Sequence, residues 1–339
     1  MDSQALLNHF TQQTQALRQG LQRVIVGHDE AINLLLICCL TDSHALLVGP
    51  PGVAKTLMVK ALAHALDWKF SRVQCTPDLM PADITGYELL GRDGADGELK
   101  MMFRPGPVFA NLLLADEINR AVPRTQSALL EAMAEHHVTL GGITHNLPDP
   151  FIVVATQNPI EMEGTYPLPE AQLDRFMMRI DVGYPTMDQE QAIVQATRGT
   201  EIALPEAVMS QDTFVQLREL VRAVPVAESV VAYAVRLCSL SRPGAGVGGA
   251  GIGSGGADAS SMVKDFVAWG AGPRGSQNLI RAAKVTALLD GRVTPTVQDV
   301  RAVALAVLTH RIFVNHRAMS QGITARQIVD HLLIKTKTS

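Results

Sequence analysis

The chain has 339 residues, of which 47% are hydrophobic, so it is long enough for two packed domains with cores of their own. Its formal net charge of −4 excludes a strong bulk attraction to nucleic acid or to an anionic membrane. The first residues lack a secretory signal, and the apolar stretch at 31–40 is too short to span a bilayer. We therefore expect a cytoplasmic protein without membrane insertion. Four cysteines without C-x-x-C spacing predict buried thiols in a reducing compartment: Cys38, Cys39, Cys75 and Cys238.

Apolar runs alternate with helical stretches through the first half of the chain. After a helix-like segment at 5–20, the runs lie at 45–48, 70–75, 112–115, 151–155 and 177–182. Strands that alternate with helices predict a parallel sheet with helices on both faces. The expected fold class is therefore α/β, with ligands bound at the carboxyl ends of the strands.

The residues after the first run, 49–56, read G-P-P-G-V-A-K-T and precede a helix-like stretch. A glycine-rich turn between a strand and a helix points N–H groups inward and offers the positive helix end to a polyphosphate. Lys55 would reach the β- and γ-phosphates, and the Thr56 hydroxyl would bind Mg²⁺. The second glycine of the usual pattern is Ala54 here, while Gly52 still supplies a flexible position. The predicted nucleotide-binding residues are Gly49, Pro50, Pro51, Gly52, Val53, Ala54, Lys55, Thr56, Leu57 and Asp116.

Polar residues follow two of the later apolar runs. The run at 112–115 ends in Asp116 and Glu117, and the run at 151–155 leads to Asn158. Asp116 would hold Mg²⁺ directly or through water, Glu117 would polarise a water for attack on the γ-phosphate, and Asn158 would orient that water or the phosphate. By themselves, an acidic pair and an Asn-Pro turn also fit ordinary loops.

Two arginines are candidates for phosphate contacts. Arg175, within the stretch E-A-Q-L-D-R-F, would bring positive charge to the transition state of its own site or of a neighbouring subunit's. Arg274, which opens a helix in the second half, would report the state of the γ-phosphate to that region.

Three further polar residues have open interpretations. Arg120 and Arg124 follow the acidic pair closely and either contact a neighbour's phosphate or are surface charges. Gln74, on the second strand, either orients Glu117 or is a buried polar residue satisfied by the backbone.

Beyond residue 185 the pattern becomes purely helical. Apolar residues recur at helical spacing at 188–198, 210–224, 227–240, 276–290 and 296–309. We therefore expect a nucleotide-binding α/β domain at 1–185 and an all-α domain at 186–339. The glycine-rich stretch at 243–256 has no lysine-threonine pair after it, which favours a flexible insertion over a second phosphate loop.

Together these motifs resemble those of the AAA+ ATPases, and three long stretches are similar to the MoxR family. They are T-P-D-L-M-P-A-D-I-T-G at 76–86, D-E-I-N-R-A at 116–121 and E-G-T-Y-P-L-P-E-A-Q-L-D-R-F at 163–176. The resemblance covers almost the whole chain, and an alanine at position 54 is typical of the family. It implies a P-loop NTPase domain followed by a helical lid, a hexameric ring with nucleotide at the subunit interfaces, and ATP and Mg²⁺ as cofactors.

The resemblance also implies a role for each matching residue. Lys55 and Thr56 belong to the Walker A loop, Asp116 and Glu117 to Walker B, Asn158 is sensor 1, Arg175 is the arginine finger acting in trans, and Arg274 is sensor 2. Insertions at about 84–107 and 138–150 correspond to family hairpins that face the ring pore or a client. The first contains a turn-like stretch at 91–98.

The implied function is ATP hydrolysis coupled to chaperone-like remodelling or maturation of a protein partner, which the family suggests is a von Willebrand factor A domain protein. The alternative is a nucleic-acid translocase or the motor subunit of a nucleic-acid-processing complex. The acidic balance and the 4% aromatic content weigh against it. A nucleotide-dependent switch without turnover is a third possibility, against which Glu117 argues.

Overall fold

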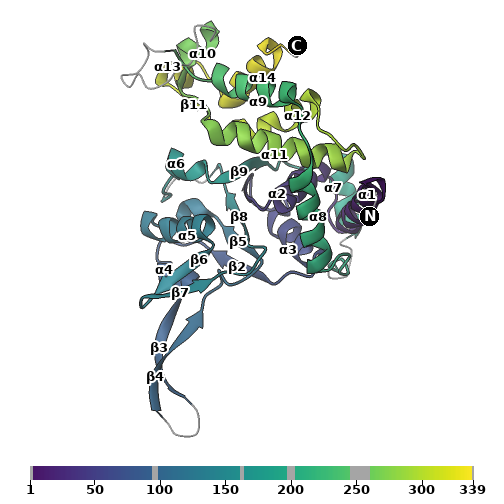
Figure 1. Ribbon diagram of the computed structural model, residues 1–339. Helices are drawn as coiled ribbons and strands as arrows, with labels where there is room; N and C mark the ends of the chain where they lie inside the picture. Colours follow the sequence, from purple (N-terminus) through teal and green to yellow (C-terminus); the bar gives the residue numbers. More distant parts are fainter. Residues whose placement is uncertain (1–2, 94–97, 161–163, 197–202, 245–259, 338–339) are drawn as a thin grey trace.

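The computed structural model describes residues 3–93, 98–160, 164–196, 203–244 and 260–337, and its centre is a five-stranded parallel sheet (Figure 1). The strand order is β2-β5-β8-β1-β9. The strands are β1 (His44–Val48), β2 (Phe70–Gln74), β5 (Leu112–Asp116), β8 (Ile152–Gln157) and β9 (Phe176–Asp181). Each apolar run expected to form a strand contributes one of them, which confirms the predicted α/β fold.

Successive side chains along each strand point to opposite faces of the sheet and pack into two separate cores, as β5 illustrates. Leu112 and Leu114 pack into the larger core, whereas Leu113 and Ala115 pack into the smaller one on the opposite face. Helices α1 (Ser3–Gln22), α2 (Asp29–Leu40) and α3 (Lys55–Ala65) contribute to the larger core, and α5 (Pro123–Glu135) contributes to the smaller. Burial on both faces explains why the strands read as continuous apolar runs.

The strand register brings the polar strand ends to one edge of the sheet. Val48 pairs with Gln157 across β1 and β8, and Gln74 pairs with Asp116 across β2 and β5. Since all five strands run parallel, the segments after β1, β5 and β8 leave the sheet on the same side.

Two antiparallel hairpins form at the predicted insertions, as expected. One, β3 (Gly86–Asp93) with β4 (Glu98–Pro105), follows the short helix α4 (Pro81–Thr85) and projects away from the rest of the molecule (Figure 1). The other pairs β6 (His137–Leu140) with β7 (Ile143–Asn146). The tip of the predicted turn at 91–98 lies outside the described residues.

The C-terminal half contains the five expected helices: α7 (Met187–Ala196), α8 (Gln211–Ala223), α9 (Glu228–Leu240), α11 (Pro273–Leu289) and α12 (Val297–Leu308). It adds the helices α10 (Ser261–Phe266), α13 (His316–Ser320) and α14 (Ala325–Lys335). The expectation of a purely helical region is wrong in one detail, because β10 (Val267–Trp269) pairs with β11 (Phe313–Val314). Strands of two and three residues are too short to show alternation in the sequence.

Helices of the second half pack directly onto the first half. Phe214 of α8 meets Trp68 edge-on with ring centroids 4.7 Å apart, and residues of α8, α9, α11 and α12 share the larger core with α1–α3. A domain boundary near residue 185 stays a prediction. Most of the glycine-rich stretch, 245–256, lies outside the described residues. Within the described part of the chain, no single helix is long and apolar enough to cross a membrane; α8 and α9 pass that test only as a pair bent by 89°.

Candidate active site

The phosphate loop leaves β1 at Gly49 and enters α3 at Lys55. A side chain at Gly49 would collide with the backbone carbonyl of Val182, so this position requires glycine. Gly52 has a φ of +82° and Ala54 a φ of +59°, both in the left-handed region. This backbone costs a residue with a Cβ about 1–2 kcal/mol, so Ala54 holds the loop in a strained conformation that glycine would adopt freely.

Lys55 is held inside the loop by the loop's own carbonyl groups. Its Nζ donates to the oxygens of Gly49 and Pro50 at 2.5 and 2.7 Å. Burial lowers the Lys55 pKa, and the nearby carboxylates of Asp116 and Glu117 oppose that shift. A polyphosphate entering the loop would compete with the two carbonyls for this ammonium group.

Asp116 ties three strands and the phosphate loop together. Its Oδ2 accepts from Thr56 Oγ1 at 3.4 Å and from Arg72 Nη2 at 2.7 Å, while its Oδ1 accepts from Thr156 Oγ1 at 2.6 Å. Arg72 lies on β2 and Thr156 on β8, the two neighbours of β5. The predicted pair of Thr56 and Asp116 is therefore brought together by the fold.

Arg72 and Thr156 were missing from the predicted site. Arg72 donates to Asp116 a second time through Nε at 3.2 Å, and Thr156 is fully buried. For Thr156 the signal in the sequence was a polar residue at the end of an apolar strand run, whereas Arg72 lies in a strand of mixed polarity and gave no such signal. Their common target became visible only once the strand order was known.

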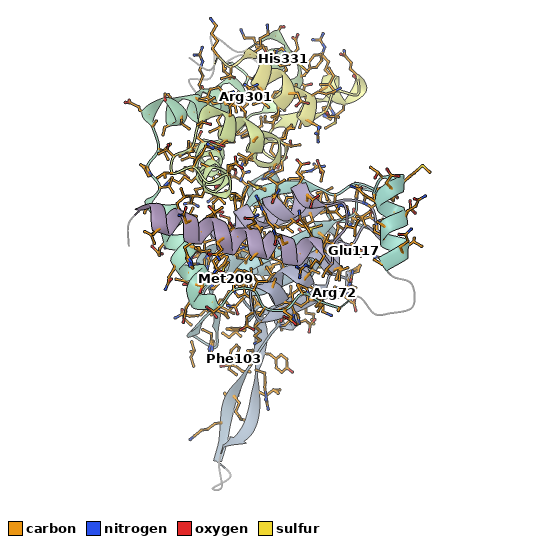
Figure 2. All side chains as sticks on the ribbon, turned by 90° about the vertical axis from the view of Figure 1, so that its right-hand side faces the viewer. Arg72, Phe103, Glu117, Met209, Arg301 and His331 are labelled. Atoms are coloured by element: carbon orange, nitrogen blue, oxygen red, sulfur yellow. The ribbon has the colours of Figure 1, made fainter. Side chains whose placement is uncertain are left out.

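Glu117 follows Asp116 in the left-handed conformation, with a φ of +56°. Its N–H donates to Thr156 Oγ1 at 2.8 Å, and its Oε2 accepts from Gln74 Nε2 at 3.0 Å and from Arg120 Nη1 at 3.2 Å. Gln74 is exposed, so of its two interpretations, contact with Glu117 is the one found. Figure 2 labels Glu117 and Arg72 in the same part of the molecule. Backbone strain at a polar, tightly bonded position is typical of functional sites.

Asn158 and the two candidate arginines occupy different places. Asn158 is buried just beyond β8, where its Oδ1 accepts from the Ile160 N–H at 3.1 Å. Arg175 follows the short helix α6 (Glu170–Leu173), and its Nη1 donates to the carbonyl of Leu130 on α5 at 3.0 Å. Arg274 contacts Asp174.

Arg175 and Arg274 line one open cavity of about 330 Å³, together with Arg281 and His136. The fold thus brings the two predicted arginines together but not to the phosphate loop. In the described ranges, neither donates a hydrogen bond to a loop residue or to the acidic pair.

A larger cavity, of about 910 Å³, adjoins the phosphate loop. Its walls come from four separate parts of the chain, including Val26, Ala54, Leu57, Ile193 and Leu204. A largely apolar hollow beside a phosphate-binding loop has the size and lining of a small-molecule site. This cavity could not be predicted from the sequence, because no single stretch of the chain builds it.

The oxygens of Thr56 and Asp116 are the ligands that Mg²⁺ prefers. No group of three or more His, Cys, Asp or Glu side chains that could hold a metal exists among the described residues. Magnesium is usually bound by one or two carboxylates together with substrate phosphates, so this pair fits a cation that arrives with a polyphosphate.

Comparison with known proteins identifies relatives along nearly the whole chain. Residues 44–178 match the model of the ATPase family associated with various cellular activities, and residues 259–332 match the AAA lid domain. Chaperone MoxR1 of Mycobacterium tuberculosis is 42% identical over 92% of this chain and 79% of its own. Protein MoxR of Paracoccus denitrificans is 33% identical over 87% of each chain. The crystal structure of a candidate ATPase from Cytophaga hutchinsonii superposes with a TM-score of 0.85 at 34% identity, covering 98% of this chain and 97% of that one.

Proposed function

This chain belongs to the MoxR family of AAA+ ATPases, and from that premise we propose that it hydrolyses ATP in an oligomeric ring to remodel or mature a protein partner. The observation that supports this best is the meeting of Thr56 with Asp116 at 3.4 Å, which joins the phosphate loop to the acidic pair. A phosphate loop opposite a strand-end carboxylate is the arrangement that holds a nucleoside triphosphate with its metal.

Nucleotide binding would use the loop and the larger cavity together. The γ- and β-phosphates would replace the carbonyls of Gly49 and Pro50 as acceptors for the Lys55 ammonium group. The loop N–H groups and the start of α3 add donors and a favourable dipole. The adenosine part would lie in the 910 Å³ cavity beside Leu57. Thr56 and Asp116 would hold Mg²⁺, which when bound neutralises charge on the phosphates.

Glu117 would accept a proton from, or polarise, the attacking water. Its carboxylate accepts hydrogen bonds from Gln74 and Arg120. We infer that these donors hold Glu117 in a resting orientation, and that hydrolysis requires the Gln74 contact to be given up. Asn158, at the same edge of the sheet, would orient the water or the γ-phosphate.

The separate position of Arg175 and Arg274 supports a site completed by a neighbouring subunit. Each is exposed at the 330 Å³ cavity, and within the described residues neither donates a hydrogen bond to its own phosphate loop. We infer that each would serve the nucleotide of the next subunit in a head-to-tail ring. Arg274 would thus act beside the arginine finger.

The client would be a protein, and the family resemblance suggests one with a von Willebrand factor A domain. The relatives are described as chaperone or MoxR proteins, which does not favour the nucleic-acid alternative. Cytoplasmic location remains part of this proposal.

The test is steady-state ATPase activity at increasing protein concentration, with particle mass measured at each point with and without ATP. We expect turnover per subunit to rise as rings form and to be abolished in Lys55→Ala, which removes the ammonium group from the loop. Lys60→Ala is the matched control, because it removes an exposed lysine from the same helix, α3. Constant turnover per subunit down to the monomer would refute the shared site.

A further inference from the structure

Arg311 is a buried arginine that connects the C-terminal helices to the segment carrying Arg175. It follows α12 and precedes β11, and only 3% of it is exposed. α12 packs against β9, and Figure 1 shows α6 and β9 just below the level of α11. From this position the guanidinium group reaches across to residues 174–177.

The contacts of Arg311 lie on both sides of Arg175. Nε donates to Asp174 Oδ1 at 2.8 Å and Nη2 to the Asp174 carbonyl at 3.2 Å. Beyond Arg175, Nη2 donates to the carbonyl of Phe176 at 2.6 Å and Nη1 to that of Met177 at 3.0 Å. The backbone before and after Arg175 is therefore fixed by one side chain.

Only an arginine can make this set of contacts. The guanidinium group is planar, always charged and carries five donors in a rigid fork, whereas lysine offers a single point charge. Arg274 also binds the second carboxylate oxygen of Asp174, at 3.3 Å. The Asp174 carboxylate therefore joins Arg311 to Arg274, and Arg175 is the next residue in the chain.

We propose that Arg311 is a positioning residue for the arginine finger: it sets the direction in which Arg175 leaves the backbone and makes that direction follow the C-terminal helices. The inference rests on the proposed function, in which Arg175 acts on the neighbouring subunit's nucleotide. A misplacement of about 1 Å in a catalytic group can cost about 100-fold in rate, so loss of Arg311 should weaken the finger without touching the nucleotide site of its own subunit.

Mixed rings distinguish a weakened arginine finger from a damaged nucleotide site in the same subunit. Glu117→Gln subunits keep a finger but cannot hydrolyse, and Arg175→Ala subunits keep a hydrolytic site but lack a finger. Each alone should be nearly inactive. An equimolar mixture should recover about one quarter of wild-type turnover, because half of the subunits have a working site and half of those face a finger in a head-to-tail ring.

Arg311→Gln is then placed in one partner at a time. In the finger donor, together with Glu117→Gln, it should reduce the recovered turnover by roughly 100-fold. In the acceptor, together with Arg175→Ala, it should leave the recovery within about two-fold and the KM for ATP unchanged. The matched control is Arg301→Gln. Arg301 lies on α12, shortly before Arg311 in the chain, but donates to Tyr233 Oη and the Leu333 carbonyl within the helical region (Figure 2). It should have little effect in either partner.

Asp174→Asn provides a second route if Arg311→Gln subunits fail to enter rings, as judged by particle mass. It keeps the side-chain shape but removes the charge that Arg311 contacts, and should show the same asymmetry between donor and acceptor. Equal losses in both arms for whichever variant assembles would overturn the positioning role. If the parent mixture recovers no turnover, the shared site itself is wrong, so failure of the proposed function is distinguishable from failure of this inference.

Discussion

Acidification should destabilise the folded chain through His44, a buried residue at the start of β1. Its Nε2 lies 3.1 Å from the Met133 carbonyl, and its Nδ1 accepts from the Val153 N–H at 3.0 Å. This pattern requires the neutral ring with a proton on Nε2, because a protonated Nδ1 would face another donor. Burial lowers the His44 pKa to about 4, from an ordinary value of 6.5.

The sign follows from proton uptake. The unfolded chain binds a proton at His44 below pH 6.5, and the folded chain does so only near pH 4, so stability is lost as the pH falls through this window. At about pH 5 the difference amounts to ~2 kcal/mol from His44 alone. His310, whose pKa burial and Arg311 also hold well below its usual range, adds a loss in the same direction.

The assay is urea unfolding followed by tryptophan fluorescence at about pH 7.5 and about pH 5. His44→Gln isolates the contribution, since His310 is present in both proteins and cancels. We expect the variant to lose ~2 kcal/mol less than the wild type between the two pH values, whatever its absolute stability. Equal losses in the two proteins would refute the assignment of a buried neutral imidazole.

Three other outcomes follow from the site. Ala54→Gly should raise the free energy of unfolding by about 0.5–1 kcal/mol, because it relieves the left-handed backbone but increases the entropy of the unfolded chain. A lower free energy of unfolding, measured by urea denaturation, would show that the backbone is not strained at this position. Gln74→Ala should raise basal ATP turnover about three-fold, equivalent to a hydrogen bond of ~0.7 kcal/mol on Glu117, and a decrease would make Gln74 a productive partner instead. Arg175→Ala should bind ATP normally, measured with a fluorescent analogue, and lose on the order of 10³ in turnover; near-normal turnover in assembled rings would exclude it as the finger.

The features that sequence predicts well here are local ones. The strand at 112–116 is recognisable from a short apolar run, and the phosphate loop from a glycine-rich turn. The contacts of Arg72 and Thr156 with Asp116 depend instead on β2 and β8 being the neighbours of β5, and strand order is not encoded in any short window.

The contacts of Arg311 likewise could not be predicted from a short stretch of sequence. It lies 137 positions from Asp174 in the sequence, in a stretch without a recognisable motif, and only tertiary packing places the two together. The strained backbone at Ala54 and Glu117 likewise cannot be read from residue type, since alanine and glutamate rarely adopt positive φ.

The bonds of Lys55 within its own loop mean that the nucleotide site contains a built-in competitor. The carbonyls of Gly49 and Pro50 occupy two of the three donors of the ammonium group, so an incoming phosphate competes with partners that are tethered to the loop and never diffuse away. The same partners recapture Lys55 as a product phosphate departs. Because Lys55 already has partners in the empty loop, nucleotide affinity is lower than it would be with an unpartnered ammonium group, and under the proposed function the exchange between cycles is faster.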